Sequence, residues 1–130
     1  MIDDATLKRL TDIGCTVTLC GSRVTCSVVA DSSDYDYLVV APDMQSTSDA
    51  VNAMSGDGFQ WEGSEHYQNV AASDFMSWRK DTVNLIVTSS PEFARRHALA
   101  TKLCKRFDLL GKQDRIALFQ AVLYQEDYVK

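Results

Sequence analysis

The sequence predicts a mixed α/β (α+β) fold, in which helices pack on a single sheet whose strands run in both directions. Segments with the alternating apolar pattern of strands are flanked by segments with helical periodicity. The two kinds of segment do not alternate regularly, as they would around a wholly parallel sheet. The chain has 130 residues, enough for one domain with a single core.

The expected elements follow from the spacing of apolar residues and from residues that start or stop helices. Helical spacing predicts four helices, at 3–13, 48–56, 90–109 and 112–125. Alternating spacing predicts strands at 15–20, 34–41, 75–80 and 82–88, with weaker segments at 59–62 and 65–70. Residues 23–33 have no helical period, so an irregular connection without a helix is expected there.

The ends and faces of two helices can be assigned in more detail. Ser48 is expected to cap the second helix, and Ser90-Pro91 marks the start of the third. Four residues of this third helix are expected to face the core: Phe93, Ala100, Cys104 and Phe107.

Composition limits the partners and the location of the protein. The net charge of −5 makes unspecific binding to nucleic acid or to a membrane surface an unfavourable expectation. No apolar run approaches membrane-spanning length, and the N-terminus lacks the pattern of a signal peptide. The four cysteines lack zinc-site or CxxC spacing, so reduced thiols and a cytoplasmic location are expected.

One stretch carries the main functional signal. Gly21-Ser22 ends the first strand, and glycine allows another group to approach the chain closely. Asp34 and Asp36 then begin the second strand, and residues two apart in a strand share one face. Two carboxylates on one face repel each other unless a cation lies between them, and Mg²⁺ prefers oxygen ligands.

This combination resembles the nucleotidyltransferase superfamily, which has the polymerase-beta-like fold. The chain also resembles small nucleotidyltransferase-like proteins of tailed phages, in segments 21–26, 34–40, 83–88 and 112–124. The resemblance implies a minimal nucleotidyltransferase fold over residues 1–130. It implies transfer of a nucleoside monophosphate from an NTP to an unidentified hydroxyl acceptor, with Mg²⁺ or Mn²⁺. For a phage protein, the location would be the host cytoplasm.

The resemblance also assigns roles to residues. Asp34 and Asp36 would be the catalytic metal ligands, and Gly21-Ser22 would hold phosphate. Arg23 is a candidate for added positive charge, since guanidinium suits phosphate oxygens.

Asn84 departs from the family pattern. It stands between Val83 and Leu85, where the family has a third carboxylate, and it offers a carbonyl ligand without charge or basicity. Asn84 is therefore a weak metal ligand. This substitution keeps a second function open: an inactive phage protein of the same fold that binds a nucleotide or inhibits a host protein.

A basic group lies on the third expected helix. Lys102, Lys105 and Arg106 share one face at i, i+3 and i+4 spacing. They either form a phosphate clamp or are a solvated helix face, with positive charge favoured near the helix C-terminus.

Overall fold

A computed structural model describes residues 1–63 and 75–124 of the chain. Its sheet has the strand order β1-β2-β5-β4-β3. The strands are β1 Thr16–Cys20, β2 Tyr35–Val40, β3 Gln60–Gly63, β4 Met76–Lys80 and β5 Val83–Thr88. β2 and β5 run parallel, while the other neighbouring pairs are antiparallel. The mixed sheet confirms the predicted fold class.

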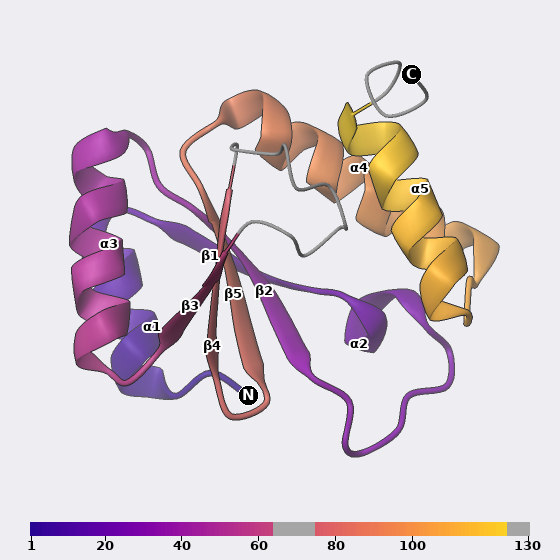
Figure 1. Ribbon diagram of the computed structural model, residues 1–130, viewed down its shortest axis with the longest axis horizontal. Helices are drawn as coiled ribbons and strands as arrows, with labels where there is room; N and C mark the ends of the chain where they lie inside the picture. Colours follow the sequence, from indigo (N-terminus) through magenta and orange to yellow (C-terminus); the bar gives the residue numbers. More distant parts are fainter. Residues whose placement is uncertain (64–74, 125–130) are drawn as a thin grey trace.

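Helices cover both faces of the sheet. They are α1 Asp4–Ile13, α2 Ser22–Thr25, α3 Met44–Gly56, α4 Pro91–Phe107 and α5 Lys112–Tyr124. α1 and α3 lie on one side of the sheet, and α4 and α5 lie on the other (Figure 1). The short α2 connects β1 to the loop that enters β2. Within the described residues, no helix is long and apolar enough to cross a membrane.

The sheet separates two apolar clusters, because successive side chains of a strand point to opposite faces. Leu85 packs with Leu10 and Met54 in the cluster under α1 and α3. Its neighbour Ile86 packs with Phe93 in the cluster under α4 and α5. All six residues of β5 are buried, as expected for a central strand covered on both faces. Cys15 and Cys20 also lie in different clusters, as their spacing predicts.

The prediction that residues 23–33 contain no helix is wrong. The carbonyl of Gly21 accepts hydrogen bonds from the backbone N–H groups of Val24 and Thr25, both at 3.0 Å. The N–H of Cys26 donates to the carbonyl of Ser22, also at 3.0 Å, which closes the turn. A single helical turn is too short to show a 3.6-residue apolar period, so the sequence pattern does not reveal it.

The start of α3 also differs from the prediction. The helix begins at Met44, and Asp43 rather than Ser48 is its N-cap. The Asp43 carboxylate accepts a hydrogen bond of 2.7 Å from the N–H of Ser46, a contact that lowers the pKa of Asp43. Asp is as effective a cap as Ser, and the extended backbone of Asp43, with φ −156° and ψ 179°, places the helical start after it.

The C-terminal end of α4 corrects a further expectation. The helix ends at Phe107, and Asp108 is the C-cap with a positive φ of 49°. Phe107 was expected to face the core, but it is 60% exposed. Its position suits the inward stripe, yet it lies in the last turn, beyond the part of α4 that packs on the sheet. The other expected core residues of this helix are buried. The segment 65–70 lies outside the described residues.

Candidate functional site

Gly21 and Asp36 are in direct contact. The end of β1 pairs with the start of β2, and the register places Cys20 opposite Asp36. Gly21 follows with a φ of +70°, a conformation that suits glycine. A Cβ atom at this position would lie 2.3 Å from Oδ2 of Asp36. The Asp36 carboxylate therefore packs against bare backbone, which explains why glycine occupies this position.

Asn84 lies beside Asp36 on the next strand. The parallel β2–β5 register pairs these two residues, and Nδ2 of Asn84 donates to Oδ1 of Asp36 at 2.9 Å. Asn84 is only 2% exposed. Its Oδ1 is buried and has no hydrogen-bond partner among the described residues. The amide thus satisfies one oxygen of Asp36 and leaves its own carbonyl oxygen unsatisfied.

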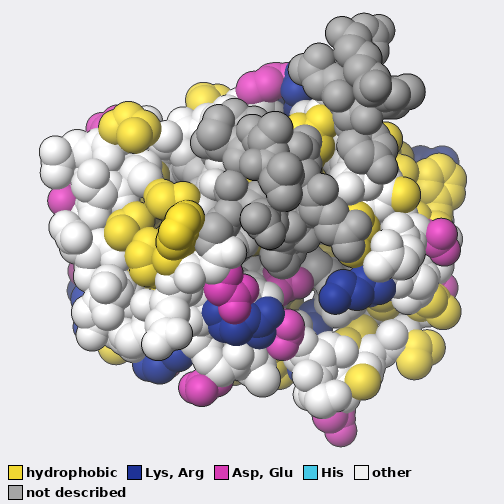
Figure 2. All heavy atoms as spheres, viewed as in Figure 1, with side chains coloured by type: hydrophobic (Ala, Val, Ile, Leu, Met, Phe, Trp, Pro, Cys, Tyr) yellow, Lys and Arg dark blue, Asp and Glu magenta, His cyan; other side chains and the backbone are white. Residues whose placement is uncertain are grey.

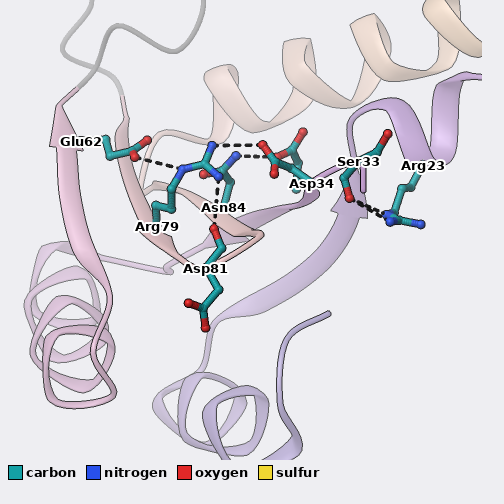
Figure 3. A network of polar contacts seen from close by, with 8 residues as sticks. Arg23, Ser33, Asp34, Glu62, Arg79, Asp81 and Asn84 are labelled. Carbon is teal, nitrogen blue, oxygen red and sulfur yellow. Dashed lines mark hydrogen bonds and ion pairs between the residues drawn. The ribbon is translucent and has the colours of Figure 1, made fainter. Parts of the chain in front are cut away.

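Arg79 of β4 completes the polar network, and the sequence pattern did not identify it. Its Nη2 lies 3.1 Å from Oδ2 of Asp34, and its Nε lies 2.9 Å from Oε1 of Glu62. Figure 3 shows the guanidinium between these two carboxylates, with Asn84 alongside. The hydrogen bond to Asp34 and the nearby negative charges raise the pKa of Arg79.

All of these residues except Glu62 line a cavity of about 380 Å³. The lining includes Gly21, Ser22, Asp34, Asp36 and Asn84. It also includes three basic residues: Arg79, Lys112 and Arg115. Hydroxyl groups come from Thr25 and Ser33, and apolar wall comes from Cys20, Ile86, Ile116 and Phe119. Figure 2 shows acidic and basic side chains side by side at the centre of one face of the molecule.

Arg23 is engaged away from this cavity. Its guanidinium donates to the backbone carbonyls of Ser33, at 2.8 and 3.2 Å, and Asp31, at 3.0 Å. It also lies over the ring of Tyr35, with 3.7 Å between Cζ and the ring centroid. Arg23 therefore holds the loop that leads into β2, and it is not among the residues that line the cavity.

The structure does not bring the basic face of α4 to the site. Lys102, Lys105 and Arg106 are exposed, and the cavity lining formed by the described residues contains none of them. The basic residues that a helix brings to the cavity instead come from α5, where Lys112 and Arg115 are three residues apart. The sequence signal for Lys112 and Arg115 was this spacing, which Ile116 and Phe119 continue on the same helical face.

Of the lining residues, Arg115 is held in place by hydrogen bonds and Cys20 is unreactive. Nη1 of Arg115 donates to the carbonyls of Leu109, at 3.0 Å, and Leu110, at 2.6 Å, and lies 3.2 Å from Sγ of Cys26. Burial, aided by the charge of Asp36, raises the pKa of the Cys20 thiol far above its ordinary value. Cys20 is therefore a neutral wall residue, because a thiol must ionise to act as nucleophile or metal ligand.

The residues present do not fit a two-metal centre. No group of three or more His, Cys, Asp or Glu side chains that could hold a metal ion occurs within residues 1–63 and 75–124. Asp34 and Asp36 each accept a hydrogen bond from another side chain, Arg79 and Asn84 respectively. The site thus balances its carboxylates with the protein's own donors.

No protein-family model matches the chain, and no curated protein matches it in sequence. The functional argument therefore depends on the geometry and chemistry of the cavity.

Proposed function

We propose that the protein binds a nucleoside triphosphate in the cavity and does not transfer its nucleotidyl group. The observation that carries this proposal is the convergence of Gly21-Ser22, the Asp36–Asn84 pair and the basic residues of α5 around one cavity. Its volume of about 380 Å³ lies in the usual range for small-molecule sites. Lys112 and Arg115 can contact phosphate oxygens, and the nucleotide would bring Mg²⁺ or Mn²⁺ as its own counter-ion.

The side chain beside Asp36 is what argues against transfer. Asn84 has no basicity, so it cannot take the proton of an attacking hydroxyl. General-base help is typically worth roughly 10²- to 10⁴-fold in rate. Because Arg79 also compensates Asp34, neither carboxylate is left without a protein partner. The site can therefore bind a nucleotide as it stands, whereas transfer would require its contacts to change.

Nucleotidyl transfer to a hydroxyl is the second candidate, and one observation favours it. Asp34 and Asp36 line the same cavity, and Asp36 lies against Gly21 next to Ser22. This is the arrangement expected of the nucleotidyltransferase-like motif. Released pyrophosphate in a mixture of protein, NTP, Mg²⁺ and Mn²⁺ would establish transfer and overturn the assignment of an inactive site.

Calorimetric titration with each NTP, in Mg²⁺ and in EDTA, tests the binding proposal. Lys112→Gln should weaken binding several-fold and reduce its salt dependence, because it removes a phosphate contact at the cavity. Lys105→Gln is the matched control: it makes the same change on the exposed face of α4. If no NTP binds, or if Lys105→Gln weakens binding as much as Lys112→Gln, the cavity is not the nucleotide site.

A further inference from the structure

We propose that the guanidinium of Arg79 is the resident cation of the Asp34–Asp36 site. It keeps divalent metal ions out, and the site takes one such ion when this charge is removed. The inference goes beyond the proposed function, because it concerns the cation and needs no nucleotide. The residues of the site differ from the metal centre that the sequence resemblance implies, and the inference starts from that difference.

All three guanidinium nitrogens of Arg79 have acceptors. Nη2 donates to Asp34 at 3.1 Å, Nε donates to Glu62 at 2.9 Å, and Nη1 donates to the carbonyl of Asp81 at 3.3 Å. These acceptors belong to the residue just before β2, to β3 and to the turn after β4 (Figure 3). Arg79 is thus a fixed cross-link between the carboxylates of Asp34 and Glu62, not a side chain free in solvent.

The sheet register directs Arg79 to this place. Asn84 pairs with Asp36 on one side and with Arg79 on the other, so the three residues form one row across β2, β5 and β4. Paired residues in adjacent strands point to the same face. The row therefore presents a carboxylate, an amide and a guanidinium on the face that also carries the cavity.

Charge rather than burial is what excludes the metal. The side chains of Arg79 and Asp34 are 34% and 40% exposed, so ions in solution can reach them. Arginine does not lose its proton in proteins, so a metal ion on Asp34 would face a permanent positive charge. Binding would require Arg79 to leave Asp34 and to give up its other contacts.

An oxygen ligand is already present for the ion that Arg79 excludes. Oδ1 of Asn84 is buried and lacks a hydrogen-bond partner within the part of the chain that the structure describes. Asn84 lines the same cavity as the two carboxylates. Asp34, Asp36 and this carbonyl oxygen would supply a hard-cation site once the guanidinium is absent.

The test uses the full chain and Mn²⁺ alone, with calorimetry and with thermal unfolding in Mn²⁺ against EDTA. The wild-type protein should show no stoichiometric Mn²⁺ binding at this site and no shift in melting temperature. Arg79→Gln should bind one Mn²⁺ at least roughly tenfold more tightly than wild type, because one nearby positive charge is gone. Mn²⁺ should raise its melting temperature, and adding Asp34→Asn should remove both effects.

Two variants control for charge and for position. Arg79→Lys keeps the positive charge and should still exclude Mn²⁺. Arg95→Gln removes an arginine that pairs with Glu92 on the exposed surface of α4, and it should leave Mn²⁺ binding at the wild-type level. If Arg79→Gln is unfolded in EDTA, Mn²⁺ should fold it. A variant that stays unfolded, or gains no Mn²⁺, contradicts the proposal, as does a wild-type Mn²⁺ site that Asp34→Asn removes.

Discussion

Gly21 carries out two tasks that no other residue type combines. Its φ of +70° redirects the chain between β1 and α2, and its lack of a side chain leaves room for the carboxylate of Asp36. Gly21 and Asp36, which belong to the same sequence motif, are therefore in direct contact in the structure. This contact fixes where the carboxylate lies relative to Ser22.

Gly21→Ala should destabilise the protein by about 3 kcal/mol, from backbone strain and from displacement of Asp36. Gly56→Ala is the control, because a Cβ there meets nothing within 4 Å. It should stabilise α3 by roughly 0.5–1 kcal/mol. Urea unfolding of both variants measures these changes, and NTP titration should show a loss for Gly21→Ala alone. Equal stabilities would mean that Asp36 can move aside without cost.

Asn84→Asp tests the amide beside Asp36. The change replaces a donor with a second carboxylate at a position that is 2% exposed. Two adjacent like charges, one of them buried, in place of a hydrogen bond should cost about 3 kcal/mol in EDTA. Mn²⁺ should restore part of this loss, because the added carboxylate offsets the charge of Arg79 and a cation can lie between the two acids.

Asn52→Asp makes the same change on the exposed side of α3 and should alter neither stability nor the response to Mn²⁺ by a measurable amount. Urea unfolding in EDTA and in Mn²⁺ compares the two variants. If Asn84→Asp behaves like Asn52→Asp, the pairing of Asn84 with Asp36 contributes nothing to stability.

At the scale of elements, Asp57 joins the two helices on the side of the sheet away from the cavity. It is the C-cap of α3, and its carboxylate accepts hydrogen bonds from Arg9 and Thr6 of α1. Its backbone carbonyl accepts from Nζ of Lys80 at 2.7 Å. One residue thus links α3, α1 and β4.

This link should make stability fall in acid. The hydrogen bonds from Arg9 and then Thr6 lower the pKa of Asp57 below its ordinary value of 3.8. A carboxyl group whose pKa is lowered by folding contributes stability above its unfolded pKa, and the contribution disappears as pH falls through the folded value. Asp57→Asn should therefore be less stable than wild type at neutral pH. The difference should shrink below about pH 4.

Melting temperature as a function of pH provides the measurement. Asp49→Asn, on the exposed surface of α3, should follow the wild-type curve. A parallel curve for Asp57→Asn, with the same offset from wild type at every pH, would show that the charge of Asp57 has no role.

The two ends of α4 predict effects of different size for the same substitution. Phe93 is 4% exposed and stacks on Phe75 with 5.1 Å between ring centroids, whereas Phe107 is 60% exposed. Phe93→Ala should cost about 3–5 kcal/mol of stability. Phe107→Ala should cost less than about 1 kcal/mol. Urea unfolding compares the pair, and similar losses would place Phe107 in a contact that its exposure does not indicate.

Elements with local signals could be predicted from the sequence, and those set by distant contacts could not. Ser90-Pro91 marks the start of α4 because capping and proline geometry act within one turn. The burial of Phe107 depends on whether another element covers the last turn of α4, and periodicity contains no such information. The single turn α2 is likewise too short to have a period.

The site divides in the same way. Gly21, Asp34, Asp36 and Asn84 lie in short motifs, and they do line one cavity. Arg79 had no such signal, because its role comes from a partner 45 residues away in the chain and from the β4–β5 register. A basic spacing on a helix was recognised at α4, but tertiary packing brought the one on α5 to the cavity instead.

At the scale of the whole molecule, β5 makes the two apolar clusters interdependent. Leu85 belongs to the cluster under α1 and α3, and Ile86 belongs to the one under α4 and α5. Neither cluster can unfold fully while β5 stays in place as the central strand of the other cluster. The domain should therefore unfold as one unit, although the described residues that line the cavity lie on the α4 and α5 side of the sheet, in α2 and in the adjoining loop.

Nucleotide binding should then stabilise both sides of the sheet equally. At an NTP concentration one hundred times Kd, mass action adds about 2.7 kcal/mol to the free energy of unfolding. The slowest-exchanging amides, which open only by global unfolding, should gain this protection in α1 and α3 as well as in β2 and β5. Hydrogen exchange followed by mass spectrometry, with and without NTP, measures it. Lys112→Gln at the same NTP concentration should reduce the gain by the same amount everywhere. Protection confined to the α4 and α5 side would show two units that unfold separately, and it would contradict the coupling through β5.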